Sequence, residues 1–381
     1  MSTRSSMREA DETWALRALA LAGRGVALTH PNPTVGAVIV RNGRIVGEGF
    51  HQYEKLDHAE VVALKQAGPK ARGATLYVTL EPCCHRGRTA ACTDAIIAAG
   101  IRRVVAAMPD PNRVVTRKGF AQLRRAGIRV DVGACAGEAR RLNEGFAKWI
   151  GTGRPFVTLK AALTLDGRIA LRPGHSTSIS SEPSRAAVQR LRHEADALVT
   201  GIGTVLADDP LLTDRSGQPR RRKLLRAVLD SRLRLPLKSR LVESARNDAI
   251  VFTTLPTDSL KARALTRAGV EVLRVAAKRG RVDLNAALRE LGRREILTVL
   301  LEAGAELNGA ALDAGIVDKM ILFYAPRIMG NGGVPMAQLS SRGFDKLRPL
   351  CDVALSSSGS DFVVQGYLHD VYRNHRSRRG D

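Results

Sequence analysis

The sequence predicts an α/β protein built from two domains. Its 381 residues are enough for two or three domains of about 100–200 residues each, and its 44% hydrophobic and 25% charged residues are typical of a globular chain. Strand-like apolar runs alternate with helix-like runs in both halves, as in layered α/β folds. Breaker residues cluster at Gly151–Pro155. We therefore expect domains at 1–150 and 151–372, followed by a basic tail at 373–381.

The first half shows an alternation of helices and strands. Strong helix formers end at Gly23 and Gly25, and two apolar runs flank Asn42-Gly43, a dipeptide typical of a hairpin. The expected helices are 13–22, 58–67, 92–99, 119–126 and 137–149, and the expected strands are 35–40, 44–50, 75–80, 104–107 and 128–132.

The alternation restarts in the second half. An Arg- and Gly-rich segment at 215–223 predicts an exposed loop. The expected strands are 156–161, 197–200, 226–229, 249–253, 296–301 and 319–325, and the expected helices are 184–195, 284–293 and 304–314.

The chain is strongly basic. Its 60 Lys and Arg residues against 37 Asp and Glu give a net charge of +23, which fits a solvated basic surface, a phosphorylated substrate or a nucleic acid. Aromatic residues make up only 4%, so few side chains can stack on bases. No apolar run is long enough for a membrane helix, and the polar first twelve residues make a secretory signal unexpected.

Cysteines cluster in the first half. Of five cysteines, Cys83, Cys84 and Cys92 fall within ten residues, and Cys135 and Cys351 lie elsewhere. An odd, clustered set argues against a disulfide framework, and it favours a reducing cytoplasm with metal or thiol chemistry.

The cysteine cluster combines with a histidine into a zinc-binding pattern. One imidazole and two thiolates, from His58, Cys83 and Cys92, suit zinc and leave a fourth position open. Glu60 is the expected proton carrier, and this order of residues is typical of zinc deaminases. Residues two apart do not share a helix face, so His58 must stand at a helix entry. Cys84 and His85 remain alternative ligands.

The motifs of the first half resemble a known family. Two segments are similar to the deaminase half of the bifunctional riboflavin-biosynthesis deaminase/reductases. They are His-Pro-Asn-Pro-Thr-Val-Gly at 30–36 and Thr-Leu-Glu-Pro-Cys-Cys-His-Arg-Gly-Arg-Thr at 79–89, which is followed by Cys92. The resemblance implies a cytidine-deaminase-like three-layer α/β/α domain, with Asn32 lining the pyrimidine site. An Asn amide can both donate to and accept from a heterocycle.

By itself the second half offers a weak nucleotide signal. Gly201-Ile202-Gly203 follows an expected strand, but Leu206 stands where a Rossmann fingerprint needs a small residue. Gly304 also lies between a strand and a helix. The strings at 160–170, 195–215 and 301–308 nevertheless extend the resemblance into the family's reductase half, which implies a dihydrofolate-reductase-like α/β domain.

The resemblance implies specific contacts in the second half. Arginine guanidiniums can fork onto a phosphate, and Glu302 can accept from ribose hydroxyls or ring N–H groups. We expect Asp208 to orient groups or relay a proton. Expected NADPH contacts are Ala162, Ser178, Thr204, Asp208, Ser231, Gly304, Ala305, Glu306, Leu307, Asn308, Gly309 and Ala310; expected substrate contacts are Ser176, Arg192, Leu212, Arg215 and Glu302.

The sequence departs from the family at several positions. Asp57, Cys84, Ala90, Ala91 and Arg113 replace usual residues near the deaminase site, but none removes an expected ligand or Glu60. In the second half, Ser178 stands where the family usually has Trp, and Ser180 replaces Thr.

The expected function is two steps of riboflavin synthesis. They are zinc-dependent hydrolytic deamination of 2,5-diamino-6-(5-phosphoribosylamino)pyrimidin-4-one and NADPH-dependent reduction of the ribosyl side chain to ribityl. We expect a cytoplasmic homo-oligomer acting on a phosphorylated pyrimidine, with no nucleic-acid or membrane partner. The alternatives are a nucleic-acid base deaminase and a deaminase with an impaired reductase domain.

Overall fold

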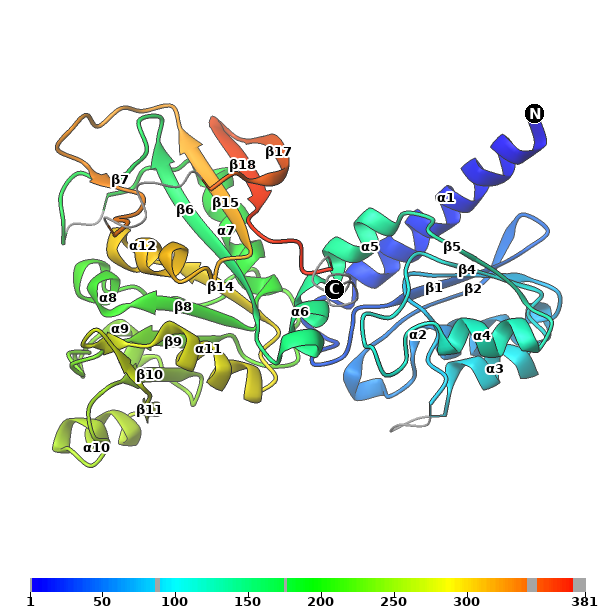
Figure 1. Cartoon of the computed structure of the whole chain (residues 1–381), viewed down its shortest axis with the longest axis horizontal. Helices are drawn as coiled ribbons and strands as arrows, with labels where there is room; N and C mark the ends of the chain where they lie inside the picture. Colours follow the sequence, from blue (N-terminus) through cyan, green and yellow to red (C-terminus); the bar gives the residue numbers. More distant parts are fainter. Residues whose placement is uncertain (1, 86–89, 175–176, 341–347, 373–381) are drawn as a thin grey trace, which may run out of the picture. The chain divides into compact units, whose positions relative to one another are not determined.

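A computed structural model describes residues 2–85, 90–174, 177–340 and 348–372. The chain divides into two compact units (Figure 1). Unit 1 comprises residues 1–152 together with 219–221, and unit 2 comprises 153–218 and 222–381. The expected tail at 373–381 lies outside the described residues. In the described part of the chain, no helix combines the length and hydropathy that crossing a bilayer requires.

Unit 1 is built on a five-stranded sheet of order β2-β1-β3-β4-β5. The first two strands form an antiparallel hairpin, β1 is antiparallel to β3, and β3 to β5 are parallel. The strands are β1 (Gly36–Arg41), β2 (Arg44–Phe50), β3 (Thr75–Val78), β4 (Arg103–Ala106) and β5 (Arg129–Val132). The helices are α1 (Ser2–Gly23), α2 (Ala59–Ala67), α3 (Cys92–Ala98), α4 (Lys118–Arg125), α5 (Ala136–Leu142) and α6 (Glu144–Thr152), with 3₁₀ helices η1 (Tyr53–Lys55) and η2 (Gly68–Ala71).

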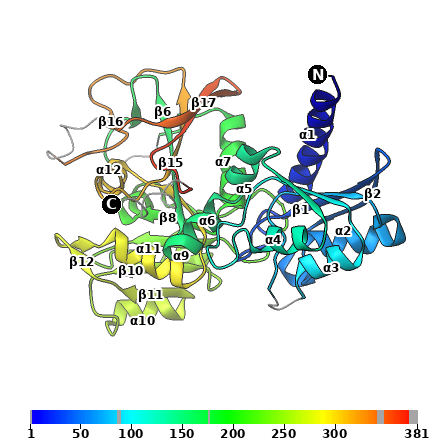
Figure 2. The ribbon, with the colours of Figure 1, turned by 45° about the vertical axis from the view of Figure 1, so that its right-hand side comes forward.

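Helices α1 and α2 cover opposite faces of this sheet (Figure 2). Gly36 faces α1, where a Cβ would lie 2.1 Å from the Ala18 carbonyl oxygen. Gly49 faces α2, and the strand register pairs it with Ala37, whose side chain lies on the face opposite to that of Gly36. The arrangement is the expected three-layer α/β/α sandwich.

Unit 2 contains a nine-stranded sheet of order β11-β10-β9-β8-β14-β6-β15-β18-β17. Each strand from β11, at one edge, as far as β15 in this order is parallel to its neighbours, and the hairpin β17–β18 adds an antiparallel edge. The nine strands are β6 (Phe156–Thr164), β8 (Ala197–Gly201), β9 (Leu225–Leu229), β10 (Ala249–Thr253), β11 (Val270–Arg274), β14 (Thr298–Glu302), β15 (Lys319–Ala325), β17 (Cys351–Ser358) and β18 (Asp361–Tyr367). Short strands outside it are β7 (Arg168–Ala170), β12 (Ala277–Lys278), β13 (Arg281–Val282) and β16 (Val334–Pro335).

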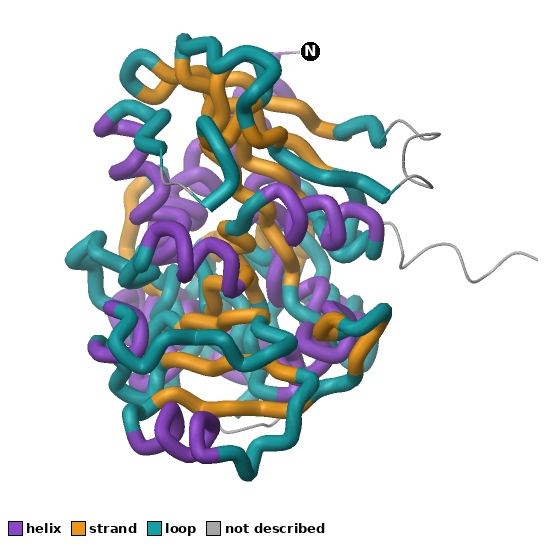
Figure 3. Tube along the Cα trace, turned by 90° about the vertical axis from the view of Figure 1, so that its left-hand side faces the viewer, coloured by secondary structure: helices purple, strands orange, loops and turns teal. Residues whose placement is uncertain are grey.

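Helices lie on both faces of the unit 2 sheet, as Figure 3 shows. The helices are α7 (Glu182–Glu194), α8 (Ile202–Asp208), α9 (Arg240–Glu243), α10 (Leu260–Arg267), α11 (Leu284–Arg293) and α12 (Ala305–Asp313). One apolar cluster joins α11 and α12 to the sheet, and a second joins α8, α9 and α10 to it. Burying both faces explains why the central strands read as continuous apolar runs.

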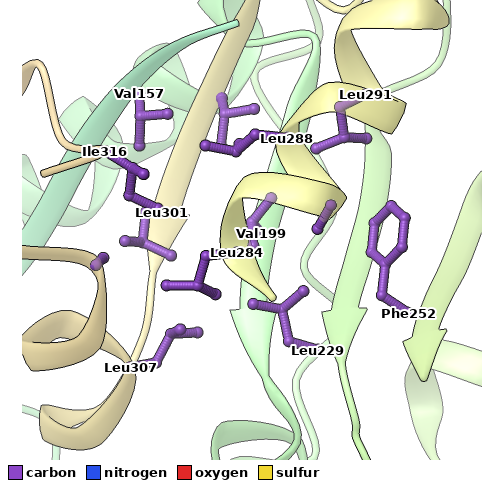
Figure 4. Close-up of a pocket in the computed structure, with 13 residues that line it drawn as sticks. Val157, Val199, Leu229, Phe252, Leu284, Leu288, Leu291, Leu301, Leu307 and Ile316 are labelled. Atoms are coloured by element: carbon purple, nitrogen blue, oxygen red, sulfur yellow. The ribbon is translucent and has the colours of Figure 1, made fainter. Parts of the chain in front are cut away.

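The first cluster encloses a small cavity of about 20 Å³ (Figure 4). Its lining side chains are all apolar, among them Val199, Phe252, Leu288 and Leu301. A site that binds a charged nucleotide needs polar groups, so this cavity is a packing void of the core and not a binding site.

The expected α/β alternation is confirmed in both units. The single helix expected at 137–149 is wrong: α5 and α6 are separated at Asn143, whose buried amide accepts a hydrogen bond from the Thr34 backbone N–H (2.8 Å) and donates one to the Thr34 carbonyl (3.0 Å). The expectation also missed that α1 begins at Ser2, and it missed α8, α9, α10, β11 and the β17–β18 hairpin.

Candidate active sites

His58 and Glu60 stand at the start of α2. His58 is the residue that precedes the helix, with an extended backbone (φ −75°, ψ 161°), and Glu60 lies in the first turn. This is the helix entry that the spacing required. The helix lies close to β2 because Gly47 and Gly49 carry no side chain: a Cβ on them would lie 2.2 and 2.4 Å from carbonyl oxygens of α2. Close packing thus places the start of α2 against the sheet.

Cys83 and Cys92 complete a group of three potential metal ligands. Cys83 follows β3, and Cys92 is the first residue of α3. His58 Nδ1 lies 3.2 Å from Cys92 Sγ and 3.5 Å from Cys83 Sγ, and all three ligand atoms lie within 4.8 Å of one another. Ligand atoms around a tetrahedral zinc ion are separated by about 3.5 Å. The donor set and its spacing therefore fit zinc.

The three potential ligands differ in how easily they lose a proton: the contact with Cys83 raises the pKa of both Cys92 and His58. Hydrogen bonding to Cys92 and His58 lowers the pKa of Cys83, which favours the thiolate that a metal requires. Glu60 is only 3% exposed, and burial raises the pKa of its carboxyl. A buried carboxyl beside the ligands has the position and chemistry of a proton carrier.

The neighbours of Cys83 have other roles. Cys84 and His85 do not join the ligand group among the described residues. Glu81 is buried, and its carboxylate accepts hydrogen bonds from the backbone N–H groups of Asp110 (3.2 Å), Arg117 (2.8 Å) and Phe120 (3.2 Å). It therefore ties the segment before Cys83 to the start of α4.

The sequence analysis missed two side chains close to the ligands. His51 is 3% exposed; its Nε2 lies 3.0 Å from Asn32 Nδ2, and its ring is 5.2 Å from the ring of His58, edge to face. Burial raises the pKa of Asp110 to about 6. His51 belongs to no motif quoted for the sequence, so only the fold brings His51 and Asn32 together.

Nearby contacts hold the loop that carries Asn32. The Tyr53 N–H donates to the Leu28 carbonyl (3.1 Å). Arg221, which groups with unit 1, donates to the His30 carbonyl (2.9 Å) and forms an ion pair with Glu54 (2.6 Å). These contacts thus fix the backbone just before Asn32.

In unit 2 the expected contacts gather at the carboxyl ends of parallel strands. Glu302 ends β14, Gly201 ends β8, and Ala162 lies near the end of β6. Because these strands are neighbours in the sheet, their ends lie at one edge, where ligands of open α/β sheets bind.

Glu302 is the centre of a charged cluster at this edge. Arg192 forks onto its carboxylate at 2.7 and 3.1 Å, and Lys160 Nζ lies 3.6 Å from it. Although burial raises the pKa of Glu302, Lys160 and Arg192 together lower it below its ordinary value. We expected the Arg192 guanidinium to bind a phosphate, but in the structure it donates both bonds to the Glu302 carboxylate. Lys160, missed in the sequence, lies within an otherwise apolar strand run.

The remaining expected residues differ in exposure. Ser178, Asp208, Arg215 and Glu306 are exposed, while Leu212, Ala305, Asn308 and Gly309 are buried. The expected contact residues that are partly buried are Ala162, Thr204, Ser231, Gly304, Leu307 and Ala310. The amide of Asn308 donates to the carbonyls of Ala303 and Met336. Ser176 lies outside the described residues.

Two helix starts at this edge suit a dinucleotide phosphate. Gly304 precedes α12 and Gly201 precedes α8, and neither helix has a side-chain cap. A Cβ at Gly304 would meet nothing within 4 Å, so the backbone there is open to approach. Backbone N–H groups at a helix start favour anions, so the residues fit NADPH.

Two family models match separate parts of the chain. Residues 8–108 match the cytidine and deoxycytidylate deaminase zinc-binding region, and residues 155–363 match the RibD C-terminal domain.

Curated relatives and solved structures match both halves together. The riboflavin biosynthesis protein RibD of Aquifex aeolicus is 43% identical over 94% of this chain and 98% of its own, and that of Escherichia coli is 43% identical over 88% and 93%. The RibD structure of Acinetobacter baumannii superposes with a TM-score of 0.84, 38% identity and coverage of 94% and 99%. A Thermotoga maritima structure, described as a diaminohydroxyphosphoribosylaminopyrimidine deaminase and 5-amino-6-(5-phosphoribosylamino)uracil reductase, has a TM-score of 0.81, 36% identity and coverage of 95% and 99%.

Proposed function

The chain belongs to the RibD family of bifunctional riboflavin-biosynthesis enzymes, and from this premise we propose how its residues perform the two reactions. It is a zinc-dependent deaminase in its first half and an NADPH-dependent reductase in its second, acting on small pyrimidines. The expected alternative of a nucleic-acid base deaminase is not favoured, because a curated relative named riboflavin biosynthesis protein RibD matches along nearly the whole chain.

The proposed substrate of the first step is 2,5-diamino-6-(5-phosphoribosylamino)pyrimidin-4-one. The name of the Thermotoga maritima structure, whose chain is similar over 95% of this one, supports this choice. Water adds to the amino-bearing ring carbon and ammonia leaves, so that an oxygen replaces the amino group. The net charge of +23 suits a phosphorylated substrate.

In the deaminase half, His58, Cys83 and Cys92 are the proposed zinc ligands. Zinc, when bound, supplies a Lewis acid that makes a nucleophile available from water near neutral pH. Glu60 takes a proton from the attacking water and returns it to the departing amine, a role that its burial beside the ligands supports. Asn32, with its amide held by His51, binds the pyrimidine edge.

In the reductase half, the edge around Glu302 is the proposed site of ribosyl reduction. NADPH, when bound, supplies the hydride that is transferred to the ribosyl C1. Gly304 and the start of α12 hold its phosphates, and Glu302, held by Arg192 and Lys160, accepts from ribose hydroxyls. The exposed Arg215 binds the substrate phosphate. Asp208 is kept as the proposed proton relay.

We further propose a cytoplasmic homo-oligomer that binds neither nucleic acid nor membrane. Exposed apolar side chains on the β17–β18 hairpin support self-association: Val353, Leu355 and Phe362 are 53%, 76% and 57% exposed. The five cysteines are free thiols, which suits a reducing compartment. Light scattering of the purified protein tests whether it is a homo-oligomer, and a monomer at micromolar concentration would contradict the proposal.

The buried Glu60 beside three clustered ligands is the observation that carries the deaminase assignment. Cys92→Ala should lose zinc and ammonia release, yet still reduce the deaminated substrate with NADPH. Glu60→Gln should keep zinc and lose ammonia release by about 10²–10⁴-fold. Deamination that persists in Cys92→Ala would contradict the ligand set. If the wild-type chain did not oxidise NADPH with the deaminated substrate, the second half would instead be an impaired reductase, the alternative that Ser178 in place of the usual Trp suggests.

A further inference from the structure

Helix α7 is bonded to three successive residues of the segment that follows Leu212. Arg192 Nη1 donates to the Thr213 carbonyl (3.1 Å), and His193 Nδ1 lies 3.1 Å from Asp214 Oδ2. The Arg215 N–H donates to the Gln189 side-chain oxygen (2.9 Å). The last turns of α7 therefore hold this segment residue by residue.

The pair formed by His193 and Asp214 is the buried part of this contact. Their side chains are only 6% and 8% exposed. The second carboxylate oxygen of Asp214 accepts from the Ser216 N–H (2.9 Å), so one carboxylate fixes both the helix contact and the local turn. A polar group is buried at little cost only when it is bonded, and removing either partner leaves the other unsatisfied.

The segment held by this pair lies next to the reductase site. The same Arg192 that donates to Thr213 forks onto Glu302. Arg215 directly follows Asp214 and is exposed, in contrast to the buried pair. The long Arg215 side chain loses rotamer entropy on binding a phosphate, so a fixed backbone beneath it lowers the cost of binding.

We infer that His193 and Asp214 are positioning residues for the reductase substrate. They fix residues 213–216 against α7 so that Arg215 is presented to a phosphate monoester. The inference rests on the proposed role of Arg215 and assigns no direct contact with substrate to the pair. A defect in the pair therefore weakens substrate binding and leaves NADPH binding and the chemical step in place.

Steady-state kinetics of the full chain on deaminated substrate test this inference. Asp214→Ala and His193→Ala should each raise the KM for the substrate by about 10-fold, with kcat and the KM for NADPH within about twofold of wild type. Asp214→Asn and His193→Asn should recover part of the loss, because an amide can bond in place of the carboxylate or of Nδ1. Asp258→Ala, at an exposed Asp of the same unit, is the matched control and should match wild type.

Three outcomes separate the possibilities. Unchanged substrate KM in Asp214→Ala, with a raised KM in Arg215→Ala, overturns the inference and leaves the proposed function standing. Unchanged KM in Arg215→Ala overturns both the role of Arg215 and the inference that acts through it. Equal effects on both KM values and on kcat overturn positioning in favour of general destabilisation. An unchanged kcat and an unchanged KM for NADPH report that unit 2 is folded, ammonia release reports the same for unit 1, and the two Asn variants carry the test if the Ala variants do not fold.

Discussion

Replacing Gly49 by alanine should disable the deaminase half through a displacement of α2. The added Cβ would lie 2.4 Å from the Ala59 carbonyl oxygen and 2.7 Å from the Val62 Cβ. Ordinary contact begins near 3.4 Å, so the start of the helix must move by about 1 Å. The atoms that move are backbone atoms next to His58 and Glu60, which no side-chain rotation can relieve.

The expected magnitude follows from the tolerance of the site. Metal ligands must stand within about 0.2 Å of their bonding distances, and a misplacement of about 1 Å costs about 10²-fold in rate. Gly49→Ala should therefore lower zinc content and reduce ammonia release by about 10²-fold. Overpacking of this kind should also lower the free energy of unfolding by about 1–3 kcal/mol.

The assay compares zinc content, ammonia release and NADPH oxidation in one preparation. Gly137→Ala is the matched control, because a Cβ there meets nothing within 4 Å and the residue lies in α5 of the same unit. NADPH oxidation on deaminated substrate should be unchanged in both variants. Wild-type zinc content and ammonia release in Gly49→Ala, or an equal loss in Gly137→Ala, would refute the close-packing argument.

Three further substitutions test stability and the second site. Burial raises the pKa of Asp11, but hydrogen bonds, first from Arg103, outweigh it and hold the pKa below 3.8. The stabilisation is therefore fully present above pH 3.8 and is lost as the pH falls through the lower folded-state pKa. Asp11→Asn should cost about 1 kcal/mol at pH 7 and progressively less as the pH falls below 3.8, and urea titrations showing a constant difference would contradict this. Ser259→Ala removes the cap of α10 and should cost about 1 kcal/mol by thermal unfolding; no change in the transition would count against the cap. Gly309→Ala would place a Cβ 1.8 Å from the Gln338 carbonyl oxygen, so α12 and the segment at Gln338 must move apart. Its NADPH KM should rise with ammonia release unchanged, and a normal NADPH KM would contradict that.

The proposed zinc ligands could be singled out in the sequence because each belongs to a local motif. His58 and Cys92 lie at helix starts, and Cys83 follows a strand, so periodicity and breaker residues already placed them on elements. The choice of Cys83 over Cys84 rested on Pro82, which directly precedes Cys83 as the deaminase pattern expects. Among the described residues, Cys83 and not Cys84 joins His58 in the group of potential ligands.

The second site was less predictable, since its groups come from separate strands. Arg192 appeared in the sequence as a phosphate ligand, yet its fork is occupied by Glu302, 110 residues away. Lys160 begins the 160–170 string but was given no role there, and it joins the cluster because β6 and β14 are neighbours in register. The break at Asn143 has the same origin, because its partner Thr34 is distant in the chain.

The sequence by itself determined the α/β class and the family resemblance, and it singled out the proposed zinc ligands. All of these depend on short spacings and on residue chemistry, which a linear chain displays directly. Only the tertiary structure decided what Arg192 holds and how His51 meets Asn32. Those pairings depend on strand order and helix packing, and the contacts that set them join residues remote in sequence.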